Sequence, residues 1–329
     1  MSTAVHLAVD AQSGDYGPEV IVRGILLARK AASSPFITHL CGDKPEISHV
    51  LDDLEGEVSF DRSEFIVEHC SETISEKDKR TRVWKNRTDS SIIRCISLQK
   101  EGVVQASVSA GDSGVLIGAS LFILGRSEGT LRPALAAFIP TPRRKPVLIL
   151  DVGANLNCRA EHLVSFAHMG SSYVRRLFAT EAPATALLNI GVESIKGPET
   201  VRDAAEELQN SQEGFRGFIE GNRVLSGDVD VVVCDGFVGN VLLKTCESFY
   251  SLASSVLSGS REILEFLSSK MEVLNPENYG AVPFLGINGT VLKAHGGSSS
   301  RAIRNAVLTA LKAAENEAAG PSGYEKSER

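Results

Sequence analysis

The sequence predicts an α/β protein with a mostly parallel sheet flanked by helices. Short apolar runs rich in Val and Ile are each followed by a loop of small polar residues and then by a helix-like stretch. These runs are continuously apolar, as in strands buried on both faces. The chain also has 29 Gly, whereas aromatic residues make up only 6%. This composition therefore favours many tight loops between regular elements over a β-sandwich with a core of aromatic side chains.

The pattern of strand, loop and helix occurs five times. In chain order, the predicted pairs are Ala4–Val9 with Pro18–Lys30, Val103–Val108 with Val115–Leu124, Val147–Leu150 with Ala160–Phe178, Val229–Cys234 with Val241–Leu257, and Thr290–Lys293 with Arg301–Ala314. Pro18 is placed to start the first of these helices. Between the pairs, Glu199–Leu208 is predicted as a helix, Glu55–Thr88 as a helix and connector, and the Pro-rich segment Gly129–Thr141 as a weak boundary.

The length of 329 residues is compatible with one large α/β unit or about two domains. We expect a single catalytic domain over residues 1–317, with a helical arm at about 245–278 and a frayed tail at 318–329. No apolar run approaches the roughly 20 residues of a membrane helix. The formal charge of −7 argues against a nucleic-acid binder. The six scattered cysteines form no CxxC pair, so reduced thiols in the cytoplasm are expected.

Ligands of parallel sheets bind beyond the carboxyl ends of the strands, where these small-residue loops fall. In the loop Ser109–Gly114, SAGDSG, backbone amides and the start of a helix favour phosphate or carboxylate. Asp112 either caps that helix or repels a nearby anion. The letters GDSG also occur in serine proteases, but a loop from strand to helix is the wrong context for Ser113 as a nucleophile.

Three further loops carry polar groups. Asp10 and Asp15 either orient a lysine or magnesium ion or cap turns. In DGFVGN, the amide of Asn240 and the ammonium of Lys244 suit an anion, unless Lys244 is simply solvated. KAHGG places a cation and His295 at a strand end, where the imidazole can act as an acid or bind an anion. Neither a dinucleotide fingerprint nor a P-loop is present, and no metal spacing is seen, so no cofactor and no metal are expected.

Taken in order, the loops resemble one family. DAQSGDYGPE, SAGDSG, LDVGANLNCRAEHLVSFAHMGSSY, LLNIGVESIKG, the segment containing DGFVGN, and YGAVPFLGINGTVLKAHGGSS are similar to motifs of the bacterial phosphate acyltransferases that use acyl carrier protein. The resemblance covers residues 4 to about 310. It implies a Rossmann-like fold related to isocitrate and isopropylmalate dehydrogenases. It also implies transfer of a long-chain acyl group from acyl carrier protein to inorganic phosphate for phospholipid synthesis.

The resemblance further implies a cytoplasmic homodimer, with peripheral membrane contact in some members, and a glycerol-3-phosphate acyltransferase that consumes the acyl phosphate. For catalysis we expect Lys293, His295 and Asn240. For binding of substrate or phosphate we expect Asp10, Gly14, Asp15, Ser109, Gly111, Ser113, Gly114, Asn155, Lys196, Asp235, Gly236, Gly239, Lys244 and Asn288.

Three alternatives stay open at this point. The donor is coenzyme A, as in a phosphotransacetylase; or the chain is a dehydrogenase of the related fold; or it is a non-enzymatic scaffold for lipid enzymes. The apolar residues of the arm suit a dimer contact, an acyl-chain groove or a membrane foot, and packing within the protein is the simplest of these uses.

Overall fold

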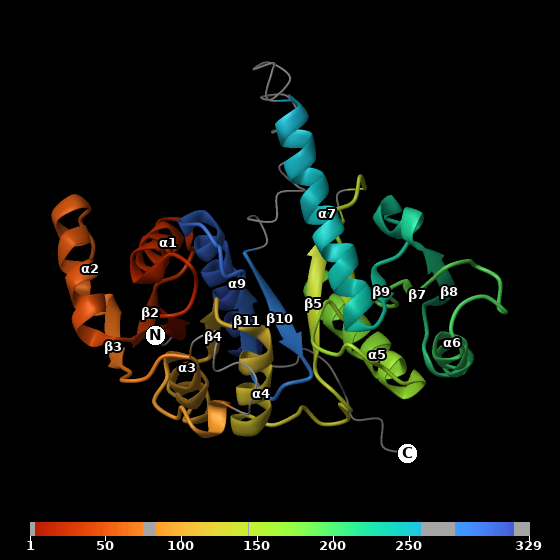
Figure 1. Ribbon diagram of the computed structural model, residues 1–329, viewed down its shortest axis with the longest axis horizontal. Helices are drawn as coiled ribbons and strands as arrows, with labels where there is room; N and C mark the ends of the chain where they lie inside the picture. The colour runs from red at the N-terminus through yellow and green to blue at the C-terminus, as the bar shows by residue number, and fades with distance from the viewer. Residues whose placement is uncertain (1–3, 75–82, 144, 258–279, 319–329) are drawn as a thin grey trace. The chain divides into compact units, whose positions relative to one another are not determined.

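The computed structural model describes residues 4–74, 83–143, 145–257 and 280–318. The chain folds as two compact units (Figure 1). Unit 1 comprises Met1–Gly125, Tyr279–Ala281 and Ile287–Arg329, and unit 2 comprises Arg126–Asn278 and Val282–Gly286.

Unit 1 contains a parallel sheet in the order β3-β2-β1-β4-β11. Its strands are β1 (Val5–Asp10), β2 (Phe36–Gly42), β3 (Phe65–His69), β4 (Ala106–Ser109) and β11 (Thr290–Ala294). Its helices are α1 (Gly17–Ala31), α2 (Lys44–Glu57), α3 (Ser91–Lys100), α4 (Ser113–Ile123) and α9 (Ser300–Ala318), with short 3-10 turns η1 (Arg62–Glu64) and η3 (Val83–Lys85).

Both faces of this sheet are buried. On β1, Leu7 and Val9 point into a core shared with α1 and α9, while Ala8 between them joins a smaller cluster with Leu98 of α3 on the opposite face. This alternation follows from the two-residue period of a strand. The helices α1 and α9 lie side by side, red and blue in Figure 1. Gly24 allows this contact, because a Cβ there would lie 2.6 Å from Ile303.

Unit 2 is also built on a sheet, in the order β10-β5-β6-β9-β7-β8. Its strands are β5 (Ala134–Ile139), β6 (Val147–Leu150), β7 (Thr185–Asn189), β8 (Phe215–Glu220), β9 (Val231–Val233) and β10 (Ala281–Leu285). The strands β6, β9, β7 and β8 are parallel, whereas β5 pairs antiparallel with both β6 and β10. The helices are α5 (Ala160–Phe178), α6 (Glu199–Ser211) and α7 (Gly236–Leu257), with the 3-10 turn η4 (Gly221–Ser226).

The predicted fold class is confirmed, since the sheets are mostly parallel and flanked by helices. All five predicted pairs of strand and helix are present, and β6 and α5 have the predicted bounds. One expectation was wrong: Glu55–Thr88 contains the strand β3. The boundary expected near Gly129–Thr141 lies close to the division between the two units after Gly125, although that segment also contains the strand β5. The arm expected at 245–278 consists of the end of α7 and residues 258–279, which lie outside the described residues, as does most of the expected tail.

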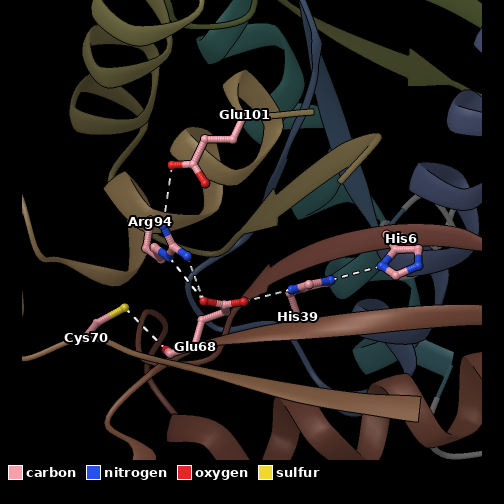
Figure 2. A network of polar contacts seen from close by, with 6 residues as sticks. All are labelled: His6, His39, Glu68, Cys70, Arg94 and Glu101. Carbon is pink, nitrogen blue, oxygen red and sulfur yellow. Dashed lines mark hydrogen bonds and ion pairs between the residues drawn. The ribbon is translucent and has the colours of Figure 1, made fainter. Parts of the chain in front are cut away.

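A chain of polar side chains ties three strands of unit 1 to α3 (Figure 2). His39 is 3% exposed; its Nδ1 lies 3.0 Å from Oε1 of Glu68, and its Nε2 lies 3.0 Å from Nδ1 of His6. Arg94 donates to the other oxygen of Glu68 from Nε, at 3.2 Å, and from a terminal nitrogen, at 2.9 Å. A carboxylate at Oε1 makes His39 Nδ1 a donor, so His39 Nε2 accepts from His6 when both rings are neutral.

Two pKa values follow from this burial. Burial raises the pKa of Glu68, but the hydrogen bonds from His39 and Arg94 outweigh it and hold the pKa below its ordinary value. Burial, and then the neighbouring His39, lower the pKa of His6. The charged carboxylate is therefore the form that the folded unit favours.

Glu68→Gln is expected to destabilise unit 1 by about 1–3 kcal/mol at pH 7, because an amide cannot accept from all these donors. Urea unfolding followed by the fluorescence of Trp84, the only tryptophan of the chain, reports on unit 1. Because the folded pKa of Glu68 is lowered, its contribution is full above its ordinary value of 4.5 and is lost as pH falls through the folded pKa. The difference in free energy of unfolding between wild type and Glu68→Gln should therefore become smaller below about pH 4.

The matched control is Glu57→Gln, which alters an exposed ion pair with Arg23 and should change stability by less than about 0.5 kcal/mol. A difference for Glu68→Gln that stays constant from pH 7 to pH 3 would contradict the assigned role of the carboxylate.

Candidate functional site

In unit 1, three adjacent parallel strands end at one edge of the sheet. β4 pairs with β1 on one side and with β11 on the other, and Lys293 stands opposite Ser109 in the register. The loops that follow these strands are the ones predicted to hold an anion. The sheet therefore brings together Asp10, Ser109 and Lys293 from distant parts of the sequence.

Asp10 organises this edge from beneath. Its side chain is fully buried, and one oxygen accepts the backbone N–H groups of Gln12 and Ser13 at 3.2 and 3.1 Å. The other oxygen accepts the hydroxyl of Ser109 at 2.6 Å. The Ser109 oxygen accepts the N–H of Gly111 at 3.0 Å in turn. These hydrogen bonds fix the conformations of the loops after β1 and β4. The Asp10 carboxylate and the Ser109 hydroxyl therefore have hydrogen-bond partners within the protein.

Close backbone contact is the reason for glycine at position 14. Gly14 has φ +107°, and a Cβ there would lie 3.2 Å from the carbonyl oxygen of Gly296 and 3.3 Å from Ala110. The N–H of Asp15 donates to the same Gly296 oxygen at 2.9 Å. All three loops meet here, around a cavity with room for about one water molecule.

Asp112 acts as a helix cap, one of its two predicted roles. Its Oδ1 accepts the N–H groups of Gly114 and Val115 at 3.0 and 3.1 Å. These amides are among the donors that the first turn of α4 would offer to an anion. Ser113 is the first residue of α4, and Gly114 is exposed beside it. The carboxylate of Asp112 therefore lies where the resemblance predicts phosphate.

Lys293 and His295 supply the positive and titratable groups. The Lys293 ammonium donates to the carbonyl oxygen of Ala110 at 3.4 Å and to that of Ala294, so it lies beside the SAGDSG loop. The exposed ring of His295 accepts the N–H of Gly297 at Nδ1, at 3.1 Å. Because this bond occupies the Nδ1 lone pair, the neutral ring carries its hydrogen on Nε2.

Asn288 is not brought to this edge. It lies in the turn before β11, where its N–H donates to the carbonyl oxygen of Gly125 at 3.1 Å. Lys293 and His295 stand at the other end of the same strand. A strand of five residues separates the two ends by roughly 16 Å, so Asn288 lies away from the loops that follow β1, β4 and β11.

Unit 2 repeats the arrangement at the ends of β6, β9 and β7. The carboxylate of Asp151, which was not among the predicted site residues, is fully buried after β6. It accepts the N–H groups of Leu135, Gly153, Ala154 and Asn155 at 2.6–3.2 Å, and the Asn155 side-chain amide at 2.9 Å. Burial raises the pKa of Asp151 even though these bonds lower it. The position was visible in the sequence, since Asp10 and Asp151 both directly follow an apolar run.

The start of α7 packs against this loop. A Cβ on Gly236 would lie 2.8 Å from the Asn155 carbonyl oxygen, and one on Gly239 would lie 1.9 Å from that of Asp151. Asp235 caps the helix by accepting the N–H of Val238 at 2.9 Å. Asp235, Gly236, Gly239 and Asn155 are therefore explained by the shape of the loop and the helix start.

The remaining predicted side chains of unit 2 face solvent. Asn240 is exposed beside Gly153, and Lys244 pairs with Glu247 at 2.7 Å. Lys196 is exposed in the loop after β7, where Asn189 donates to its carbonyl oxygen at 3.0 Å. These three side chains are the accessible polar groups among the residues predicted in unit 2.

The described residues contain no group of three or more His, Cys, Asp or Glu side chains placed to hold a metal ion. No helix within the described ranges is both long and apolar enough to cross a bilayer.

Solved structures of other enzymes share this fold. The structure of a phosphotransacetylase from Streptococcus pyogenes superposes on this chain with a TM-score of 0.66 and 14% sequence identity. The superposition includes 96% of this chain and 95% of the phosphotransacetylase chain. A 4-hydroxythreonine-4-phosphate dehydrogenase from Klebsiella pneumoniae covers 95% of this chain and 100% of its own, with a TM-score of 0.56 and 14% identity. At these identities the likeness concerns the fold alone.

Sequence comparison is more specific. A family model described as "Fatty acid synthesis protein" matches residues 5–320. A phosphate acyltransferase from Acetivibrio thermocellus is 39% identical over 329 residues, covering 95% of this chain and 94% of its own. One from Shewanella woodyi is 37% identical over 325 residues, with 95% and 94% covered. The chain belongs to the phosphate acyltransferase family, as the order of its loops predicted.

Gly239→Ala should destabilise unit 2 by about 3 kcal/mol or more, because its Cβ would collide with a backbone oxygen that cannot move aside. Urea unfolding followed by far-UV circular dichroism would show an early transition, while Trp84 fluorescence would report separately on unit 1.

The matched control is Gly221→Ala, since a Cβ at Gly221 meets nothing within 4 Å. Equal stability of the two variants would show that α7 does not pack against the Asp151 loop as described.

Proposed function

We propose that this chain transfers a long-chain acyl group from acyl carrier protein to inorganic phosphate, releasing acyl phosphate for phospholipid synthesis. The observation that carries the proposal is the set of loops at the ends of β1, β4 and β11, in a chain 37–39% identical to phosphate acyltransferases over 95% of its length. These loops place Lys293 and His295 beside backbone shaped by glycine.

The reaction needs no nucleophile from the protein. A phosphate oxygen attacks the thioester carbonyl carbon, and a C–O bond forms as the carbonyl becomes a tetrahedral oxyanion. When the carbonyl re-forms, the C–S bond breaks and the carrier thiolate leaves. The proton of monohydrogen phosphate is then available to the thiolate, so charges and atoms balance without another reactant. The protein has to align phosphate and thioester and stabilise the oxyanion.

Lys293 and His295 fit this task. The Lys293 ammonium lies at the SAGDSG loop, where its charge offsets that of phosphate. His295 presents Nε2–H to solvent because Nδ1 accepts from Gly297. That donor can stabilise the oxyanion or protonate the leaving thiolate. Gly14 and Asp15 line the cavity between these loops, and we propose that Ser113 and Gly114 at the start of α4 complete the binding surface. Asp10, Ser109 and Gly111 hold the loops in place.

For unit 2 we propose that Asn240, Lys196 and Lys244 bind substrate through their exposed polar groups. Asp235, Gly236, Gly239 and Asn155 support them by fixing the start of α7. Asn288 is left out of the site because it precedes β11.

We also propose that the protein works as a cytoplasmic homodimer with peripheral contact to the membrane, and that a glycerol-3-phosphate acyltransferase consumes its product. A helical face of α7 supports the dimer, since Phe237, Val241, Phe249 and Leu252 are all exposed on it. Burial of such a patch against a second copy is favourable. Sedimentation of the full chain at micromolar concentration as a single monomeric species would argue against the dimer.

The activity is tested by mixing the purified chain with palmitoyl carrier protein, with and without phosphate, and measuring free carrier thiol and acyl phosphate. Phosphate-dependent release of both supports the proposal. Palmitoyl coenzyme A serves as the competing donor, and faster turnover with it would identify coenzyme A as the natural carrier. A folded chain that is inactive with either donor would favour a scaffold.

His295→Asn and His295→Gln form a matched pair. Asn can still accept from Gly297 in the place of Nδ1 but has no donor where Nε2 stands, so kcat is expected to fall by about 10²–10³-fold. Gln can place an amide N–H near Nε2 and should keep more activity if the ring acts by hydrogen bonding. Steady-state rates of acyl phosphate formation decide this, and full activity of both variants would remove His295 from catalysis.

Asp112→Asn should lower the KM for phosphate by about two- to tenfold. The amide oxygen keeps the cap on Gly114 and Val115, while one negative charge is removed from the loop that is proposed to hold phosphate. Asp112→Ala is the control for the cap, with an expected loss of about 0.5–2 kcal/mol in stability. An unchanged KM in Asp112→Asn would place phosphate away from this helix.

A further inference from the structure

The helix α4 is apolar on its exposed face as well as its buried one. Residues 113–123, SGVLIGASLFI, contain no charged side chain. Val115, Leu116, Ala119 and Ser120 are buried, and α4 packs on α3, β11 and η3. The opposite side contains Gly114 and Phe122, which are exposed, and Gly118 and Leu121, which are half-buried; these four residues share one face by helical spacing.

Two aromatic side chains shape this exposed face. Trp84 of η3 lies directly on Gly118, where a Cβ would be 2.5 Å from the indole ring. Phe122 is 62% exposed, and the Lys85 ammonium lies 5.4 Å from its ring centroid. Within the described part of unit 1, only Tyr16, at 63%, is an equally exposed large apolar side chain, and it belongs to the loop after β1. Of these two residues, Tyr16 lies in a loop of the proposed site, and Phe122 lies near the far end of the helix that begins at that site.

The position of α4 indicates what covers this face. The helix begins at Ser113, directly after the SAGDSG loop. A thioester attacked at that loop has its carbonyl carbon there, so its hydrocarbon chain must leave from the same point. From Ser113 to Phe122 the helix extends about 13 Å. Because no charged side chain lies on this helix, the hydrocarbon chain could lie along it without displacing water from a charged group.

We propose that the exposed face of α4, from Gly114 to Phe122 and including Trp84, binds the hydrocarbon chain of the acyl donor. The inference rests on the proposed function and extends it, because it assigns chain-length selectivity to this helix. Gly118 holds Trp84 close to the helix, and Phe122 contacts the distal part of a long chain. A butyryl group is too short to reach Phe122, whereas a palmitoyl group passes it.

The first experiment compares donors of two lengths. The measured quantity is the ratio of kcat/KM for palmitoyl carrier protein to that for butyryl carrier protein. Phe122→Ser should lower this ratio about tenfold, because the distal methylenes lose their apolar contact. The matched control is Leu27→Ser on α1, which removes an exposed apolar side chain, 41% exposed, from the same unit and should leave the ratio unchanged.

A second experiment does not depend on turnover. Trp84 is the only tryptophan, so its fluorescence reports on this face alone. Palmitate brominated at mid-chain should quench Trp84 when it binds, whereas unbrominated palmitate should not, because bromine quenches indole only near contact. Phe122→Ser should weaken the binding seen in this titration.

The outcomes separate the two proposals. If wild type makes no acyl phosphate from any donor, the proposed function fails, whatever the quenching shows. If wild type is active but the brominated chain does not quench Trp84 and the ratio is unchanged in Phe122→Ser, the inference about α4 is overturned while the function stands. A weakened dimer in Phe122→Ser with an unchanged ratio would make the face a contact between copies and would also overturn it.

Discussion

Each unit depends on a buried carboxylate at the end of a parallel strand. Asp10 and Asp151 are both fully buried, and a charge without compensation in that position would be very costly. Each is compensated by N–H groups from the loop that follows it, and Asp10 also by the Ser109 hydroxyl. The charge therefore dictates the loop's conformation. Glycine is needed where the folded loop then meets its neighbours, at Gly14 in unit 1 and at Gly239 in unit 2.

Five of the parallel strands, β1, β4, β6, β9 and β11, were predicted from the sequence, whereas the parallel strands β2, β7 and β8 were not. Continuous apolar runs such as Val147–Leu150 identify strands buried on both faces, and the loops that follow them indicate the edge of the candidate site. β3 was missed because it is the outermost strand of its sheet and keeps exposed residues among charged neighbours. β5 was missed because its apolar run lies between prolines, which suggested a boundary. Its antiparallel pairing with β10 involves residues distant in sequence, which no local pattern encodes, whereas its pairing with β6 is local.

The sequence could predict which loops form the candidate site, but not which contacts each of their side chains makes. Ser109 belongs to the expected loop, yet its hydroxyl bonds to Asp10, a partner 99 residues away. Asn288 is near Lys293 in sequence, but strand direction places them at opposite ends of β11. Asp151 directly follows an apolar run, as Asp10 does, so its position at the end of a strand could be predicted, but its bonds to the loop could not. The role of each side chain depends on its contacts, and those contacts depend on the register in which the strands pair.

Such a site fits a reaction in which the anion itself is the nucleophile. Nothing in the chain has to be activated for attack, so the protein's contribution is alignment and charge placement. Alignment comes from backbone held by Asp10, next to Gly14, whose φ of +107° would strain any other residue. Positive charge beside this edge comes from Lys293, and Asp112 opposes it while capping α4. The same cap that fixes the start of α4 thus weakens its positive end, so the stability of the helix opposes the phosphate binding that we propose for it.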